Sequence, residues 1–188
     1  RVDEALASAV LEKVPTHPAA AMDRAQQQIA QGEVGEVLAK LQLLANTYPG
    51  WAQPALVRSR LAAEAGESQA ALAWAEQARN AEPANAVVLE HFLSQVAASV
   101  DLLNDAQAEN ALTLLDLWDS ITPNVARDNS LLRLHLLLIA GRGDDANRVL
   151  DPIISSSSHN ADQMRAVARR AQSVGEYGIA ERILTSAT

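Results

Sequence analysis

Glycines and prolines recur at an interval that reveals an internal repeat. Two pairs of glycines and one pair of prolines are each separated by 34 residues: Gly32 and Gly66, Gly141 and Gly175, Pro49 and Pro83. A fixed period of this length is typical of arrays in which each repeat is one supersecondary unit that buries its apolar face against its neighbours. The chain is therefore predicted to fold as a stack of repeats.

The segments between these residues have the pattern of amphipathic helices. Apolar residues recur three and four positions apart, and Ala and Leu supply most of them, since aromatic residues make up only 3% of the chain. Glycine and proline end the segments, because proline cannot continue a helix and glycine readily adopts a left-handed turn. The pattern predicts about eleven helices and no strand, with the helices at residues 2–14, 19–31, 34–48, 54–65, 69–81, 86–98, 107–121, 129–140, 145–154, 161–174 and 177–185.

Polar residues indicate where several helices begin. Asn85 and Asn160 each precede a helix and are predicted to cap it, and Gln163 is placed to complete a capping box with Asn160. Asp144 and Asp145 open another helix, where carboxylates stabilise the positive end of the helix dipole. The helix starts are thus predicted from local chemistry alone.

Alignment on the turn glycine shows which positions the repeats share. Five residues after it stand Val37, Ala71, Ala146 and Ala180, and twelve residues after it stand Leu44, Ala78, Ile153 and Ala187. The first set is predicted to lie where the two helices of a hairpin cross, because small side chains let helix backbones approach. Ala71 and Ala180 should therefore be nearly buried, and the second set should face the next unit.

Residues 66–85, GESQAALAWAEQARNAEPAN, match the second helix of a tetratricopeptide repeat nearly throughout. The last unit matches through Met164, Val167, Ala168, Ala171, Gly175, Glu176, Tyr177 and Ala180. The chain resembles this family over most of its length. The resemblance implies an all-α fold, a right-handed superhelix of antiparallel helical hairpins in a single array over residues 1–188. It implies about five repeats, at 18–51, 52–85, 86–125, 126–160 and 161–188, after a leading helix at 2–14.

Some positions depart from the family pattern. Arg24 and Arg58 occupy places where a large apolar residue is usual, which predicts a shifted packing register for the first helices of units one and two. The third unit has Ala106 in place of the turn glycine. About six extra residues near 99–107 are predicted to form a lengthened helix or a longer loop. Pro152 lies inside a predicted helix and should kink or split it.

Composition argues against several classes of function. The formal net charge is −8 and the isoelectric point about 4.9, so an acidic surface would repel phosphate backbones and nucleic-acid binding is not expected. There is no Cys, which excludes disulfides and thiolate sites and fits a cytosol or a periplasm alike. No segment approaches the roughly 18 uninterrupted apolar residues of a membrane span. The start at Arg1 without a signal peptide indicates a piece of a longer protein, and the preference for Arg over Lys indicates a bacterial source.

Catalytic and metal-binding patterns are not recognised either. The histidines at positions 17, 91, 135 and 159 do not share metal-ligand spacing, and no His-Glu-x-x-His motif occurs. The adhesion-like tetrapeptide Gly-Arg-Gly-Asp at 141–144 lies on a repeat turn and is interpreted as a chance match. The chain is therefore not expected to be an enzyme or to hold a metal ion or a cofactor.

The resemblance implies an interaction scaffold that binds a peptide or a partner protein in a concave groove lined by the first helix of each unit. By the family's layout, the groove residues would be Met22, Gln26, Ile29, Leu56, Arg60, Glu90, Ser94, Arg165 and Arg169. The Lys and Asn residues of the family's clamp for acidic C-terminal tails are mostly missing here. An alternative is that the array is a helper region of a larger enzyme or envelope assembly, such as a glycosyltransferase, a secretion factor or an envelope-biogenesis factor. The oligomeric state is left open.

Arg165 and Arg169 are the most specific of these candidates. They are four residues apart on one predicted helix, so their side chains share a face. Two guanidinium groups there would capture a carboxylate or an acidic peptide segment, because guanidinium pairs bidentately with carboxylates. The alternative is a solvated helix face on which Asp162 balances the charge.

Overall fold

The protein is a series of α-helices joined by short turns, as seen in a computed structural model that describes residues 17–122, 129–155 and 161–186. Within these residues there are α-helices and one short 3-10 helix, and no strand, which confirms the all-α prediction. The elements are α2 (Pro18–Ala30), α3 (Val34–Thr47), α4 (Gln53–Glu64), α5 (Ser68–Ala81), α6 (Ala86–Ala98), η1 (Val100–Leu102), α7 (Asp105–Ile121), α8 (Ser130–Ile139), α9 (Gly143–Ser155), α10 (Ala161–Ser173) and α11 (Tyr177–Ser186). The helix expected at 2–14 and the cap expected at Asn160 lie outside the described residues.

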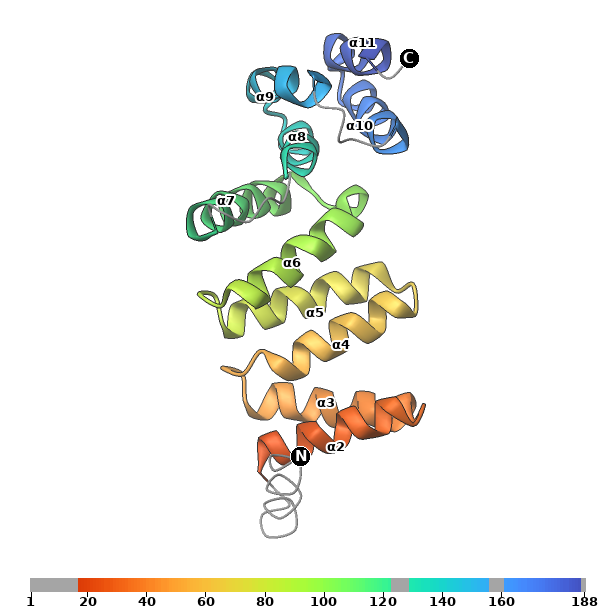
Figure 1. Ribbon diagram of the computed structural model, residues 1–188, viewed down its shortest axis with the longest axis vertical. Coiled ribbons are helices and arrows are strands. Elements are labelled where there is room, and N and C mark those ends of the chain that lie inside the picture. The colour runs from red at the N-terminus through yellow and green to blue at the C-terminus, as the bar shows by residue number, and fades with distance from the viewer. Residues whose placement is uncertain (1–16, 123–128, 156–160, 187–188) are drawn as a thin grey trace. The chain divides into compact units, whose positions relative to one another are not determined.

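The helices fall into two compact units that divide inside α6, between Phe92 and Leu93. In the first unit α2, α3, α4 and α5 pack consecutively as antiparallel helices (Figure 1). In the second unit α8 packs on α7, α9 and α10, and α11 packs on α9 and α10. Each helix therefore buries its apolar face against near neighbours in the chain. The single array over 1–188 and its repeat boundaries stay predictions.

Two apolar clusters hold the first unit together. One joins α2, α3 and α4 through Met22, Ala25, Val37, Leu41 and Val57. The other joins α4, α5 and α6 through Ala52, Ala55, Leu56, Ala78 and Val88. Both clusters are built from the apolar stripes of the sequence, as expected when packing of an amphipathic face supplies most of a helix's stability.

The four repeat glycines make the same turn in four hairpins. Each has a positive φ, between 69° and 85°, a region that only glycine enters at little cost. In each turn the residue after the glycine donates its N–H to the carbonyl five positions back, as Glu67 does to Ala62 at 2.8 Å and Glu176 does to Ala171 at 2.8 Å. These are Schellman caps, which satisfy carbonyls that the helix end would leave unpaired. The periodic glycines therefore close the hairpins α2/α3, α4/α5, α8/α9 and α10/α11.

The small residues five positions after each turn glycine are buried, as the alignment predicts. Ala71 and Ala146 are 0% exposed, Ala180 is 1% exposed and Val37 is 0% exposed. Ala111, at the equivalent place in the unit without a turn glycine, is 1% exposed. Buried residues, small in four of these five positions, are what a close crossing of two helices requires.

The third hairpin is built differently. Between α6 and α7 the extra residues form η1 and a short loop, which is the longer connection expected at 99–107. The helix α7 begins at Asp105, because the Asn104 side chain accepts from the N–H of Gln107 at 2.9 Å and the Gln107 side chain accepts from the N–H of Asn104 at 3.1 Å. This capping box replaces the glycine turn as the signal that starts the second helix of the hairpin.

Two further expectations meet different outcomes. Of the kink or split predicted at Pro152, the split is wrong, because α9 runs continuously through it to Ser155, and the kink stays a prediction. Proline removes only the bond to the Arg148 carbonyl, and it does so in the last turn of the helix, where little helix remains to be disrupted. Asn85 does cap α6, since its side-chain oxygen accepts from the N–H of Val87 at 3.0 Å.

Arg58 occupies a position where an apolar residue is expected, and its guanidinium stacks on an aromatic ring. Its guanidinium carbon lies 3.9 Å from the centroid of the Trp74 ring on α5, and its Nη1 donates to the side chain of Gln42 on α3. Burial lowers the pKa of Arg58, which nevertheless stays protonated because guanidinium titrates far above neutral pH. The aliphatic part of an arginine side chain can pack against apolar surface while its guanidinium stacks on an aromatic ring or forms a hydrogen bond. In this way an arginine can take the place of an apolar residue between helices.

Candidate functional site

The second unit contains a hollow of about 410 Å³ between the C-terminal half of α6, α8 and α10. These are the first helices of three successive hairpins. The apolar part of the wall comes from Leu93, Ala97, Leu131, Leu132 and Ala166. A volume of this size lies within the range of small-ligand pockets. The hollow is therefore a concave feature of this unit that a ligand could enter.

His135 is a half-buried polar residue in this wall. Its Nε2 is inaccessible to water and has no hydrogen-bond partner among the described residues. Burial lowers the pKa of His135, a hydrogen bond with the Ala166 backbone and the Asp101 carboxylate raise it, and the charge of Arg170 lowers it. The net shift is downward, so His135 is a neutral imidazole near pH 7.

A second, shallower hollow of about 270 Å³ adjoins the first and shares Asp101 and Ala166 with it. It is also lined by Arg169, Arg170 and Ser173. Arg170 is paired, because its Nη2 lies 2.9 Å from Asp101 Oδ1. Arg169 is exposed and forms no ion pair with the residues that the structure describes. The two hollows together present an apolar floor, a neutral imidazole and one uncompensated guanidinium.

Ser59 and His91 form a serine–histidine pair in the first unit, but it is not a nucleophile. Ser59 is 0% exposed, and its hydroxyl donates to the Ala71 carbonyl at 2.8 Å. Its single proton is thereby used, so the contact of 2.8 Å between His91 Nε2 and Ser59 Oγ has the imidazole as donor. A base in this tautomer cannot activate the hydroxyl.

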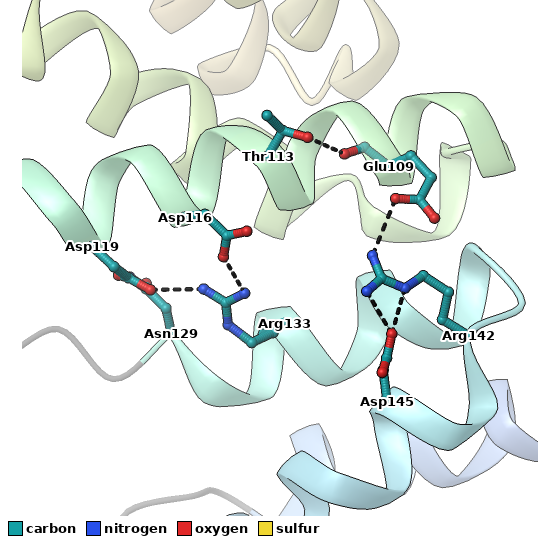
Figure 2. Close-up of polar contacts among 8 residues, drawn as sticks. All are labelled: Glu109, Thr113, Asp116, Asp119, Asn129, Arg133, Arg142 and Asp145. Atoms are coloured by element: carbon teal, nitrogen blue, oxygen red, sulfur yellow. Dashed lines mark hydrogen bonds and ion pairs between the residues drawn. The ribbon is translucent and has the colours of Figure 1, made fainter.

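Ion pairs link α7, α8 and α9 across the surface of the second unit (Figure 2). Arg133 contacts Asp116 at 2.5 Å and Asp119 at 2.8 Å, so α8 is tied to α7. Arg142 contacts Glu109 at 3.3 Å and Asp145 at 2.5 Å. Arg142, in the tetrapeptide at 141–144, is thus engaged by two carboxylates. The interpretation of this tetrapeptide as a chance match stays a prediction.

The described residues contain neither a cluster suited to a metal ion nor a helix suited to span a membrane. Within the described part of the chain, no group of three or more His, Asp or Glu side chains is arranged to hold a metal ion. None of the helices there combines the length and the apolar character needed to cross a membrane.

No protein-family model matches the sequence, and no curated protein matches it significantly. Solved structures do match the fold. YrrB, described as a TPR protein with an unusual peptide-binding site, superposes with a TM-score of 0.64 at 15% identity over 96% of this chain and 90% of its own. MamA from Desulfovibrio magneticus RS-1 gives 0.57 at 13% identity over 90% and 92%. The kinesin light chain TPR-like repeats of Podosopora anserina give 0.51 at 16% identity over 92% and 95%.

The chain has the tetratricopeptide-repeat fold. The matches span almost the whole of both chains, and the hairpins, the turn glycines and the small crossing residues are the features that this fold needs. Identities of 13–16% establish the fold and nothing finer.

The tetratricopeptide-repeat layout and the structure agree on only some of the predicted groove residues. Met22 and Leu56 are 3% and 4% exposed and belong to the apolar clusters of the first unit, so they hold helices together and do not form a surface. Ile29 is half-buried against one of those clusters. The others are at least partly accessible: Gln26, Arg60, Glu90, Ser94, Arg165 and Arg169.

The two candidate arginines of α10 have different surroundings. Arg169 lines the shallower hollow, whereas Arg165 lines neither hollow and pairs with Asp162 at 2.8 Å. The sequence reasoning missed His135 and Asp101. The repeat does contain a signal for the histidine, because the same residue position, six before the turn glycine, is occupied in four repeats by Gln26, Arg60, His135 and Arg169.

Proposed function

We propose that this tetratricopeptide-repeat chain is an interaction scaffold that binds an extended peptide segment of a partner protein along the C-terminal half of α6, α8 and α10, within the second unit. The observation that carries the proposal is the hollow of about 410 Å³ between α6, α8 and α10, whose wall combines apolar side chains with the polar side chains of His135, Asn129 and Gln163. A peptide suits such a wall, because its backbone supplies donors and acceptors and its side chains can cover apolar surface. The peptide-binding site for which YrrB is described is in keeping with this use of the fold.

Binding is proposed in preference to catalysis because of how the reactive groups are placed. The buried Ser59 hydroxyl is committed to a carbonyl, and the imidazole beside it is a donor. Nε2 of the neutral imidazole of His135, which lines the hollow, has no hydrogen-bond partner among the described residues. An acid or base needs such a partner or a substrate-orienting group to act in catalysis.

The test is a selection of peptides of about 12 residues displayed on phage against the full chain, followed by calorimetric titration of the enriched peptides. We expect at least one family of peptides to bind with a Kd of about 100 µM or tighter. Ala97→Phe should abolish that binding, because Ala97 is exposed and lines the hollow, so a phenyl ring there fills it.

Ala39→Phe is the matched control, since Ala39 is an exposed alanine on α3, in the other unit. Both variants should keep the melting temperature of the parent. Failure to select any binding peptide, or equal binding by the Ala97→Phe protein, would refute the proposal.

A further inference from the structure

The connection between α6 and α7 is built unlike the glycine turns that close the other hairpins. It consists of η1, a single 3-10 turn, and a short loop. Both ends of this connection are fixed. Before it, the buried Ser99 donates its N–H to the carbonyls of Gln95 and Val96 at the end of α6. After it, the buried Leu103 leads into the capping box that starts α7.

Between these fixed ends, η1 itself is held weakly. The N–H of Leu103 lies 3.4 Å from the Val100 carbonyl, which is long for a hydrogen bond, and the hydrogen bonds of 3-10 turns have poorer geometry than those of α-helices. Leu102 is 56% exposed and therefore does not anchor the turn in the core. The turn is thus a short strap that can move without unravelling the ends of α6 and α7.

An ion pair ties this strap to α10. The Asp101 carboxylate of η1 lies 2.9 Å from the Arg170 guanidinium of α10. Asp101 lines both the larger hollow of about 410 Å³ and the shallower hollow of about 270 Å³, and Arg170 lines the shallower one. Ala166, one turn before Arg170, also lines both. The ion pair therefore lies at the border between the two hollows.

We infer that η1 is a movable strap and that the ion pair between Asp101 and Arg170 is its latch. When the latch is closed, the strap divides the concave surface of the second unit into two hollows. When the latch opens, the two hollows join into one groove. The use of this groove by an extended peptide rests on the proposed function, whereas the movement of the strap does not.

The strength of the latch suits reversible opening. The Asp101 side chain is 80% exposed and the Arg170 side chain 23% exposed, so solvent and salt screen their attraction. An exposed ion pair of this kind changes an equilibrium by about two- to fivefold. A strap held by close-packed apolar side chains would instead open only with disruption of the core. The latch should therefore open more often when its charge is removed or screened.

The experiment measures access to the border between the two hollows. The chain has no cysteine, so Ala166→Cys introduces a single thiol at a half-buried position that lines both hollows. The rate of thiol modification is measured with a small neutral reagent, iodoacetamide, and with a bulky neutral maleimide. The ratio of the bulky-reagent rate to the small-reagent rate reports access, because a change in the thiol pKa alters the thiolate fraction equally for both reagents.

Asp101→Asn keeps the size of the side chain and removes the charge of the latch. In the full chain carrying Ala166→Cys, it should raise this ratio about two- to fivefold. Raising the salt concentration to about 0.5 M should raise the ratio when Asp101 is present and have little effect on Asp101→Asn. Asp151→Asn is the matched control, since it breaks the exposed pair of Asp151 on α9 with Arg182 on α11 and lines neither hollow. It should leave the ratio unchanged.

The outcomes separate this inference from the proposed function. Equal ratios for Asp101→Asn and Asp151→Asn, or a ratio that does not respond to salt, would overturn the latch whether or not a peptide binds. If the ratio rises as expected but no peptide can be selected, the latch stands and the scaffold function fails. With a selected peptide, Asp101→Asn should also increase the association rate, because the open form is more populated. An unchanged association rate would show that the strap does not control entry to the groove.

Discussion

His91 donates from its Nε2 to the hydroxyl oxygen of Ser59 at 2.8 Å, and that hydroxyl donates in turn to the Ala71 carbonyl at 2.8 Å. The chain of two hydrogen bonds connects α6, α4 and α5 at the level where α4 and α5 cross on Ala71. It satisfies a buried hydroxyl and settles the tautomer of the imidazole. A short side chain at residue 59 is required for the crossing, and a hydroxyl is required for the bonds.

Ser59→Ala should destabilise the protein by about 1 kcal/mol, because it removes a buried hydrogen bond to the Ala71 carbonyl and leaves the half-buried His91 N–H without its acceptor. The loss should appear as a lower midpoint of urea unfolding. Ser120→Ala serves as the control, since Ser120 is exposed and bonds only to the carbonyl of Leu117 on its own helix. Equal midpoints for the two variants would contradict the assigned role of Ser59.

Stability should fall as the pH drops below about 6.5. The pKa of His91 is lowered by burial and then by the charge of Arg60, and the pKa of His135 is lowered chiefly by burial. Each histidine has a lower pKa in the folded state than in the unfolded state. At a pH between these two pKa values, the unfolded state therefore binds more protons than the folded state. The contribution to stability is complete above the unfolded pKa and is lost as the pH falls toward the folded pKa. Carboxylates have lower pKa values than histidine, so the loss of stability in the upper part of this pH range comes from the histidines.

Melting temperatures measured between pH 7.5 and 5 check this expectation. His91→Gln keeps a side-chain donor for Ser59 but does not titrate, so its melting temperature should depend less on pH than that of the parent. A curve for His91→Gln parallel to the parent's would show that this histidine is not responsible.

Gly66→Ala should destabilise the protein by about 1 kcal/mol, because Gly66 has φ of +77° and an alanine there is strained even though no atom lies within 4 Å of its Cβ. Gly35 lies in α3 without a positive φ, and its Cβ position is equally open. Gly35→Ala should therefore stabilise the protein by up to about 1 kcal/mol through helix propensity. Thermal unfolding of both variants gives the signs; the same sign for both would be incompatible with the turn geometry.

Ala71→Leu should destabilise the protein by about 1–3 kcal/mol, because Ala71 is 0% exposed at the crossing of α4 and α5 and extra methyl groups would overpack it. Ala73→Leu is the control on the same helix, where the side chain is exposed and a leucine should be tolerated. An Ala71→Leu protein that melts at the parent's temperature would refute the close crossing.

Much of the fold follows from local signals that the sequence displays. Asn85 and Ala98 bound α6 where the pattern placed it, since a capping side chain and the loss of helical spacing act within a few residues. The start of α7 was placed two residues late, because the box between Asn104 and Gln107 was not recognised. Continuity through Pro152 was also missed, because the cost of one proline depends on where in the helix it falls.

The candidate site was predictable only in part. The repeat register placed Arg165 and Arg169 on one face of α10, which is correct for residues four apart. Of the two, Arg165 pairs with Asp162 and only Arg169 lines a hollow, beside the pair formed by Arg170 and Asp101. Met22 and Leu56 were placed on a surface by family layout and lie in the core, because neighbouring helices cover them.

The sequence by itself determined the period, the turns and the crossings, because a glycine at positive φ and a small residue at a helix contact are requirements of the local backbone. Only the tertiary structure decided that His135 lines a hollow and that Arg169 has no ion pair with the residues that the structure describes. Burial and pairing are properties of side chains brought together from three helices, and no spacing along one helix specifies them.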